Sequence, residues 1–399
     1  MKNIRHQFPL LKNYKDLVYL DNAATTQKPQ SVIKTVTQFY QRQNANVHRG
    51  AYKLSDTSSR LYLQAHKTIA DFIDAREDEI IFNSGATEGI NTLAYSLCKD
   101  IDSKSNVVIT QMEHHSNLIP WAEMAKRKGF GLRVIPFDHQ SQALDLDALD
   151  TLIDENTKVV SIIHVSNVLG VISPVDAIIK RARAVGAYTI IDACQSVAHM
   201  PLSMKALDCD FCVFSGHKIY GPTGIGVLYG KRALLSKMDP FMYGGGMVGM
   251  LTDDSIAWND LPMKFEAGTP NIAGAIGLAA AVEFLQEIGM DVVKEHSISL
   301  TKYAVEALGS VSGVRLYASS AQRMGVLPLS VTGVHSHDVA SVFDSENIAV
   351  RSGQHCATPI VRSFTEEGIV RASVAVYNDE KDIDRLIIAL EKVKKMFKV

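Results

Sequence analysis

Short, strongly apolar segments alternate with amphipathic segments through the middle of the chain. Between several of the apolar segments the sequence has helical periodicity, as in residues 117–129 and 174–186, which both end on glycine. The apolar segments are strand-sized and lie at residues 79–82, 106–110, 132–137, 158–165, 188–193, 210–215 and 224–230. Buried strands separated by helices are typical of a largely parallel sheet that is covered on both faces. The pattern therefore predicts an α/β fold.

The pattern changes after about residue 275. Residues 275–289 and 296–311 have helical patterns, and the chain ends in an amphipathic helix over residues 379–398. Strand candidates lie between these helices, at residues 314–318, 325–331 and 347–353. We expect a large cofactor-binding domain over residues 21–288. A smaller α+β domain is expected from residues 1–20 and 289–399, with an apolar helix rather than a flexible linker joining the two.

Composition narrows the functional classes. The 399 residues are 46% hydrophobic and 21% charged, with 41 Lys and Arg against 43 Asp and Glu. No basic stripe is visible, so neither nucleic acid nor a membrane surface is an expected partner. The N-terminal residues lack the apolar core of a signal peptide, and no apolar stretch reaches about 18 residues. Five sparse cysteines do not indicate a disulfide framework. We therefore expect a cytoplasmic protein.

Polar residues follow three of the predicted strands. In NSGATEGIN (83–91) the free N–H groups at Ala86 and Thr87 can hold a phosphate, or Thr87 or Ser84 can simply cap a helix. Asp192 ends an apolar strand, where an unpaired carboxylate is costly. Its carboxylate either meets a positively charged partner in a functional site or forms a structural ion pair or cap. Lys218 follows another strand in a glycine-flanked loop, where it is a Schiff-base candidate or a surface lysine.

The three strand ends fit one cofactor when they are taken together. The carboxyl ends of parallel strands meet at one edge of a sheet. Pyridoxal 5′-phosphate needs a phosphate cradle, a lysine for its aldehyde and an acid for its ring nitrogen. A dinucleotide site is not expected, because the glycines of GPTGIG (221–226) have the wrong spacing and precede a strand.

Cys356 lies in RSGQHCATP, between Gly353 and Pro359, after the predicted strand. A single thiol of this kind is either inert packing or a nucleophile. In an extended loop the side chains of His355 and Cys356 point apart, so His355 need not activate the thiol. The CxxC pair of Cys209 and Cys212 falls on a predicted buried strand, where neither a redox nor a metal role is expected.

Ten ordered motifs cover nearly the whole chain: DNAATT, NVHRG, SGATEGIN, MEHHSN, HVSNVLG, IDACQS, SGHKIYGPTGIGVLYG, FEAGTPN, RSGQHCATP and RASVAVYN. Together they resemble the cysteine desulfurases of the class V aminotransferase group, specifically the Suf- and Csd-type (group II) cysteine desulfurase/selenocysteine lyase branch. The resemblance implies the aspartate-aminotransferase-like fold type I, pyridoxal 5′-phosphate as cofactor, and a homodimer with its active site near the interface. It also implies conversion of L-cysteine to L-alanine, and activity on selenocysteine.

The resemblance also implies roles for single residues around the cofactor. Lys218 would form the Schiff base, and Asp192 would bind the ring nitrogen. His114 would stack on the ring, and Gln195 would bond its phenolic oxygen. Phosphate contacts are implied for Ala86, Thr87, Ser215 and His217, with Thr269 reaching the phosphate from the other subunit.

At the substrate, Asn167 would lie near the carboxylate, and Arg371 would bind it as a bidentate fork. Cys356 would take the sulfur as a persulfide and pass it to an acceptor protein of the SufE, SufU or CsdE type. Such transfer supplies iron–sulfur cluster assembly or other sulfur pathways. The resemblance assigns no metal.

Two positions depart from the Suf-type pattern. Tyr52 stands in VHRGAY where histidine is frequent, and Gln354 precedes His355, as in Csd-type proteins. These changes bear on the sulfur acceptor and leave the cofactor chemistry untouched. His48, His115 and His355 are expected to be structural or supporting residues.

Three other functions are less consistent with these residues. An aminotransferase or a kynureninase-like lyase needs no thiol at position 356. A sulfur-carrier or scaffold protein with the same fold has no need of Lys218, Asp192 and Arg371. A metal hydrolase is poorly supported, because the EHH of residues 113–115 lacks the HExxH spacing.

Overall fold

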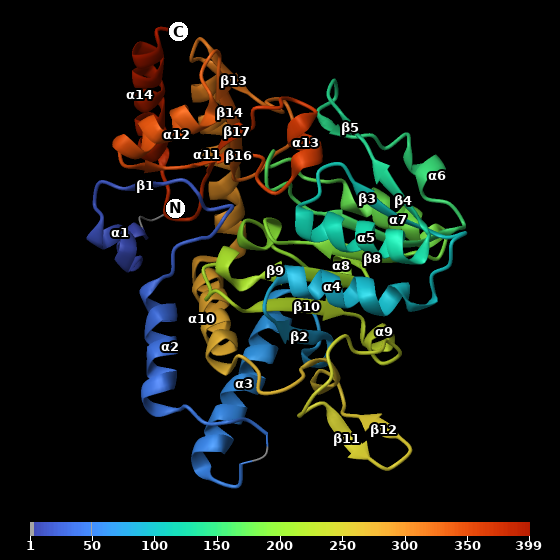
Figure 1. The fold of residues 1–399 in the computed structure, drawn as a ribbon. Coiled ribbons are helices and arrows are strands. Elements are labelled where there is room, and N and C mark those ends of the chain that lie inside the picture. The colour runs from blue at the N-terminus through green and yellow to red at the C-terminus, as the bar shows by residue number, and fades with distance from the viewer. Residues whose placement is uncertain (1–3, 49) are drawn as a thin grey trace.

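A seven-stranded sheet forms the centre of the computed structural model, which describes residues 4–48 and 50–399 (Figure 1). Arg49 of the NVHRG motif and residues 1–3 of the predicted small domain lie outside the described residues. The sheet runs β2 (Ile80–Asn83), β10 (Gly226–Gly230), β9 (Phe211–Ser215), β8 (Tyr188–Asp192), β7 (Thr157–Ile163), β3 (Asn106–Thr110) and β4 (Gly131–Ile135). Strand β10 pairs antiparallel with β2 and β9, and the remaining pairings are parallel. The fold is α/β with a mostly parallel sheet.

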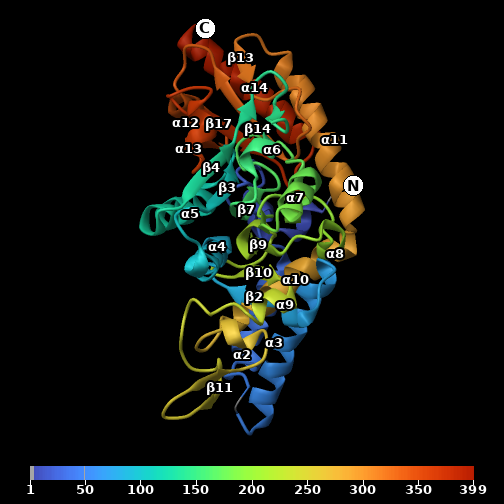
Figure 2. The ribbon, with the colours of Figure 1, turned by 90° about the vertical axis from the view of Figure 1, so that its right-hand side faces the viewer.

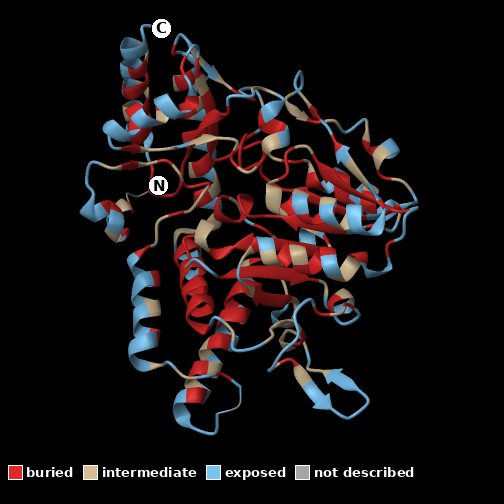
Figure 3. Cartoon of the chain, in the orientation of Figure 1, coloured by how far each residue is buried: buried red, intermediate tan, exposed pale blue. Residues whose placement is uncertain are grey.

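Helices cover both faces of this sheet. Figure 2 shows α4 (Ala86–Leu97) and α5 (His115–Lys128) on one side, and α7 (Val175–Ala184) and α8 (Met204–Leu207) on the other. Helix α10 (Ile272–Ile288) packs against α2 (Gln30–Arg42) and α3 (Lys53–Phe72). It is buried along most of its length because its residues are apolar almost all round (Figure 3).

A second sheet of four antiparallel strands lies towards the C-terminus. Its order is β13 (Val314–Leu316), β14 (Val326–Val331), β17 (Ile369–Ser373) and β16 (Arg351–Gly353). Helices α11 (Met290–Gly309), α12 (Ser336–Ser345) and α14 (Glu380–Phe397) pack on it around a separate hydrophobic cluster. The predicted residue limits of the two domains stay a prediction.

The segment near the N-terminus connects the two sheets. Strand β1 (Val18–Tyr19) pairs in parallel with β15 (Ile348–Ala349), and Asp21 forms an isolated bridge with Ser373. Asn22 donates from Nδ2 to the carbonyl of Ser373 at 2.6 Å. Residues 21–28 therefore cross from the small sheet to the end of the large one.

The remaining elements are short. They are α1 (Pro9–Asn13), β5 (Phe137–Asp138), β6 (Ala143–Leu144), α6 (Leu149–Leu152), α9 (Arg232–Leu235), α13 (Thr358–Arg362), and a hairpin of β11 (Val248–Leu251) and β12 (Ile256–Trp258). The hairpin protrudes from the body of the protein and is exposed (Figures 1 and 3). Within the described chain, no single helix is long and apolar enough to span a membrane. Helices α10 and α11 pass that test as a pair, but only by length and composition, and they are bent by 78°.

Candidate active site

A cavity of ≈ 230 Å³ opens at the carboxyl ends of β8 and β9, next to the crossing segment of residues 21–28. Residues of both sheets line it: Ala23, Ala24, Ala86, Thr87, His114, Ser116, Asn167, Asp192, Cys194, Ser215, His217, Lys218, Arg351, His355, Cys356 and Arg371. Of the twelve residues that the sequence singles out, ten lie in this wall. Gln195 is buried directly behind it and donates from Nε2 to Ala23 O at 2.9 Å.

Thr269 lies elsewhere in the described chain. It is exposed and lines a different pocket, together with Phe82, Asn83 and Asn271. Within one chain, Thr269 therefore does not belong to the cavity, and its role through a second subunit stays a prediction.

The start of α4 forms one side of the cavity. Gly85 occupies the N-cap with a φ of 149°, and neither Thr87 nor Ser84 caps the helix. Ser215 instead accepts from the Ala86 N–H at 2.9 Å, and the Thr87 hydroxyl lies 2.8 Å from Ser116 Oγ. The interpretation of NSGATEGIN as a simple side-chain cap is wrong. The Ala86 N–H is thus not free, but the start of this twelve-residue helix lies beside two hydroxyls, a setting in which an anion is stabilised.

Lys218 ends the short turn after β9. The backbone carbonyl of the residue before it accepts several hydrogen bonds. The carbonyl of His217 accepts from Thr26 N at 3.0 Å, Thr25 Oγ1 at 3.1 Å and Lys28 Nζ at 3.0 Å. Burial lowers the pKa of Lys28 to about 8. The DNAATT motif and the lysine two residues beyond it therefore fix the turn that carries Lys218. Sequence reasoning missed this role, because the donors and the acceptor are about 190 positions apart.

Asp192 ends β8 in the cavity wall and is 2% exposed. Its Oδ1 accepts from the Cys194 N–H at 3.0 Å. Among the described residues, no cationic side chain lies within ion-pair distance of it. A buried carboxylate without a cation is costly, so Asp192 suits a ligand that brings a positively charged group, such as a pyridinium nitrogen.

His114 is the N-cap of α5 and presents a neutral ring to the cavity. Its Nδ1 accepts from the Ser116 N–H at 3.1 Å. Burial, and then the nearby charge of Lys218, lower the pKa of His114 to about 4. An uncharged, partly buried ring is suited to stacking on a heteroaromatic ligand.

Glu113, next to His114 in EHH, is 1% exposed and bonded within the protein. Its carboxylate accepts from Ile163 N at 2.9 Å, Thr110 Oγ1 at 2.7 Å and Asn117 Nδ2 at 2.6 Å. Burial raises the pKa of Glu113 to about 8. In the described part of the chain, no group of three or more His, Cys, Asp and Glu side chains is arranged to hold a metal ion. Glu113 ties the turn between β3 and α5 to the end of β7.

Arg371 lies at the opposite wall on β17 and is 2% exposed. Its Nη1 donates to Asn167 O at 3.0 Å, and its Nη2 pairs with Asp21 Oδ1 at 3.1 Å. The fork predicted to bind a substrate carboxylate is thus partly occupied by the protein, by Asp21 of the N-terminal segment and by the carbonyl of Asn167.

Three buried polar atoms of the cavity wall have no hydrogen-bond partner within the described part of the chain: Arg371 Nε, Asn167 Oδ1 and His355 Nδ1. Such atoms are usually satisfied by a bound group. One donor and two acceptors match the carboxylate and ammonium groups of an amino acid. This wall of the cavity therefore offers unpaired hydrogen-bonding atoms to a substrate. The opposite wall has the start of α4, which suits an anion, and Asp192, which suits a cation.

Cys356 is half-buried and faces the same cavity as Lys218. The expectation of an extended loop is wrong: His355 and Cys356 have φ of 51° and 55°, so the chain makes a left-handed turn here. Each such non-glycine residue costs roughly 1–2 kcal/mol. Hydrogen bonds offset this cost, because Asn167 Nδ2 donates to His355 O at 2.9 Å and His115 N donates to Cys356 O at 2.7 Å.

The other four cysteines are buried. Burial raises the thiol pKa of Cys98, Cys194 and Cys209 to about 12, and it also raises the pKa of Cys212 well above the usual thiol value. His355 is buried and uncharged, since burial lowers its pKa to about 3, and its Nε2 lies 2.9 Å from Ile369 O. Cys356 is therefore the thiol placed to react.

The two positions that depart from the Suf-type pattern lie apart from each other. Tyr52 is exposed at the N-cap of α3. Gln354 donates from Nε2 to Glu366 O at 3.1 Å, on the outer side of the Cys356 turn. Neither residue lines the cavity.

The family model for aminotransferase class-V matches residues 18–386. This chain belongs to the class V aminotransferase family. A probable cysteine desulfurase of Halalkalibacterium halodurans is 44% identical, with 99% of this chain and 98% of the relative covered. The structure of a cysteine desulfurase from Thermococcus onnurineus NA1 has a TM-score of 0.94 at 37% identity, covering 99% of this chain and 98% of that one. CsdA of Escherichia coli, also a cysteine desulfurase, has a TM-score of 0.91 at 36% identity, covering 98% of both chains.

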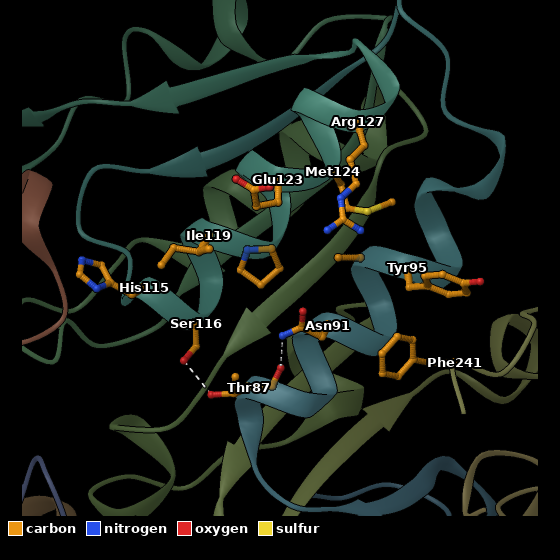
Figure 4. Close-up of a pocket in the computed structure, with 12 residues that line it drawn as sticks. Thr87, Asn91, Tyr95, His115, Ser116, Ile119, Glu123, Met124, Arg127 and Phe241 are labelled. Carbon is orange, nitrogen blue, oxygen red and sulfur yellow. Dashed lines mark hydrogen bonds between the residues drawn. The ribbon is translucent and has the colours of Figure 1, made fainter. Parts of the chain in front are cut away.

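Members of this family use pyridoxal 5′-phosphate, and the cavity fits that cofactor. The start of α4 with Ser215 suits the phosphate, and Asp192 has no cationic partner among the described residues. Lys218 lines the same cavity from a turn that hydrogen bonds to the His217 carbonyl hold in place. The resemblance to the Suf- and Csd-type branch and the fold type I prediction are confirmed. A groove of ≈ 440 Å³ between α4 and α5 adjoins the cavity of this class V aminotransferase and shares Thr87 and Ser116 with it (Figure 4).

Proposed function

We propose that this class V enzyme is a cysteine desulfurase, which converts L-cysteine to L-alanine and holds the sulfur on Cys356 as a persulfide. The observation that carries the proposal is the shared cavity of Lys218, Arg371 and Cys356. The full-length similarity to cysteine desulfurases supports the same reaction. An aminotransferase needs no thiol at this point.

Each of these residues has a separate role in the reaction. Bound pyridoxal phosphate supplies an aldehyde for the substrate amine and an electron sink for the Cα–H bond. Arg371 binds the substrate carboxylate, and the Lys218 amine carries protons to and from the substrate carbon atoms. Asp192 keeps a proton on the ring nitrogen.

Cys356 carries out the sulfur transfer. Its thiolate attacks the substrate sulfur and forms an S–S bond, while the substrate C–S bond breaks and its electron pair stays on carbon. The carbon takes up the proton that the Cys356 thiol released, and L-alanine leaves. The persulfide keeps the hydrogen of the substrate thiol, so no external oxidant or reductant is needed.

The proposal extends to the fate of the sulfur. An acceptor protein of the SufE, SufU or CsdE type would take it for iron–sulfur cluster assembly or other sulfur transfer. The residues that flank the turn support access for a partner, since Arg351 and Pro359 are exposed. L-Selenocysteine is proposed as a second substrate, because it offers the same amine and carboxylate. The five free thiols are in keeping with a reducing cytoplasm.

A homodimer is also part of the proposal. The β11–β12 hairpin exposes large apolar side chains, with Leu251 70% exposed, and an isolated two-stranded hairpin has little stability of its own. Thr269 is exposed and lies outside the cavity of its own chain, so it can contribute to the cavity of a second subunit. Both observations support a subunit interface on this side of the molecule.

Mass spectrometry after incubation with L-cysteine tests the function. We expect one added sulfur atom on the peptide that contains Cys356, and none in Cys356→Ser, which should still bind the cofactor. Cys98→Ala, which removes a buried thiol far from the cavity, should keep the modification. Alanine release by Cys356→Ser at the parent rate would contradict the proposal and leave a general pyridoxal-phosphate enzyme.

A further inference from the structure

The residue after the stacking histidine contacts the turn that carries the thiol. His115 is the first residue of α5, and its backbone N–H donates to Cys356 O at 2.7 Å. An N–H at this position has no partner within its own helix. The start of α5 therefore uses a free donor to hold the carbonyl of the reactive cysteine.

The side chain of His115 makes a second contact two residues further along. Its Nε2 lies 3.3 Å from Thr358 N and 3.1 Å from Thr358 Oγ1. Thr358 begins α13, whose N-cap residue Ala357 makes no side-chain cap. Because a backbone N–H can only donate, Nε2 accepts the hydrogen bond from Thr358 N. His115 thus supplies from another helix the cap that α13 lacks.

The two contacts enclose a strained segment. His355 and Cys356 are the two consecutive left-handed residues of the turn, and Asn167 holds the carbonyl on the upstream side. His115 holds the downstream side at Cys356 O and at Thr358. Figure 4 shows His115 at one end of the neighbouring groove, which it helps to line, and Ser116 beside it faces Thr87.

We propose that His115 is a positioning residue for the nucleophile: its ring holds the Cys356 turn in the left-handed conformation that directs the thiol into the cavity. Because His114 precedes His115 at the start of α5, one short segment determines the positions of both the ring-stacking group and the thiol. This inference concerns the conformation of Cys356. It holds whether or not the persulfide is passed to an acceptor.

The test compares His115→Ala with His115→Gln in the holoenzyme. His115→Ala keeps the backbone N–H and loses the ring cap, whereas glutamine restores an acceptor for Thr358. In His115→Ala we expect alkylation of Cys356 by iodoacetamide to become about five- to tenfold faster, because the released thiol turns to solvent. The kcat for L-cysteine should fall by about the same factor, with KM and the cofactor absorbance unchanged. His115→Gln should lie within about threefold of the parent in both rates.

Faster alkylation together with a lower kcat indicates a positioning role, since general loosening of the site would also change KM and cofactor binding. Parent-like alkylation in His115→Ala, or a fall in both rates together, would overturn the proposal. If His115→Ala does not fold, His115→Phe decides. It keeps a ring at this position but has no acceptor for the Thr358 N–H, so it must shift both rates in the same opposite directions. Unchanged rates in His115→Phe would then reject the role of the ring.

Discussion

Asp21 and Arg371, 350 positions apart in sequence, form an ion pair at 3.1 Å in the wall of the active-site cavity. The Arg371 guanidinium is almost completely buried and Asp21 is partly exposed. The ion pair and the bond to Asn167 O leave Nε as the unpartnered donor of Arg371. The protein thus orients the guanidinium before a substrate binds, and the substrate carboxylate meets a group that needs no reorganisation.

Arg371→Ala should raise the KM for L-cysteine by roughly ten- to a hundredfold, because a charge-assisted contact to a carboxylate is worth about 1.5–3 kcal/mol. Steady-state kinetics of alanine release measures this. Arg351→Ala is the matched comparison, since Arg351 lines the same cavity but is exposed. A larger rise in KM in Arg351→Ala than in Arg371→Ala would assign the carboxylate to Arg351.

Lys218→Ala should abolish turnover and covalent attachment of the cofactor. Treatment with borohydride followed by denaturation should leave the parent chain with one cofactor attached at Lys218, as measured by peptide mass spectrometry, and the variant with none. Lys231→Ala is a suitable control, because Lys231 pairs with Asp208 and Asp210 at the other end of β9. Retention of the cofactor by Lys218→Ala under these conditions would place the Schiff base on another lysine.

Stability should decrease below about pH 6.5 because of buried histidines such as His199. Burial, and then the charge of nearby His296, lower the pKa of His199 to about 4. Between these values the unfolded chain binds a proton that the folded chain does not, so the free energy of unfolding falls by about 1.4 kcal/mol per pH unit for this residue. Above pH 6.5 the effect is absent.

Urea unfolding of the parent and of His199→Gln at about pH 7.5 and about pH 5.5 measures this contribution. The loss of stability between the two pH values should be smaller in the variant, which has no proton to bind at this position. An equal loss in both proteins would show that His199 is not kept neutral by the fold.

The proposed dimer predicts that Leu251→Glu and Ile256→Glu on the hairpin shift the protein towards a monomer, because a charge there meets apolar surface in the interface. Sedimentation velocity gives the oligomeric state. Met396→Glu, at an equally exposed apolar position on α14, should leave it unchanged. If the parent and the hairpin variants have the same mass in solution, the hairpin is not part of the interface.

Much of the large domain is predictable because apolar periodicity depends on local sequence. The strand predicted at residues 106–110 coincides with β3, and that at 188–193 differs from β8 by one residue. The placement of Asp192 and Lys218 follows from the same logic, since carboxyl ends of neighbouring strands meet. The antiparallel direction of β10 was not predicted, because a strand's apolar pattern is the same in either direction.

Long-range polar contacts of the site were not predictable from local patterns. Nothing near Asp21 indicates that it pairs with Arg371, and nothing in EHH shows that His115 caps a helix more than 240 positions away. The turn at Cys356 was expected to be extended, because non-glycine residues rarely take positive φ. It departs from that rule because hydrogen bonds from Asn167 and His115, distant in sequence, hold the two carbonyls.

The crossing of residues 21–28 has a consequence for how the enzyme is made. These residues are synthesised before their partners Ser373 and Arg371, which follow about 350 positions later. Contacts across such a sequence separation form late, after the local parts of each domain. The hydrogen bonds to the His217 carbonyl can form once β9 exists, whereas the orientation of Arg371 has to wait for β17. The cofactor side of the cavity can therefore form before the substrate side, because a nascent chain that has not yet reached β17 lacks Arg371.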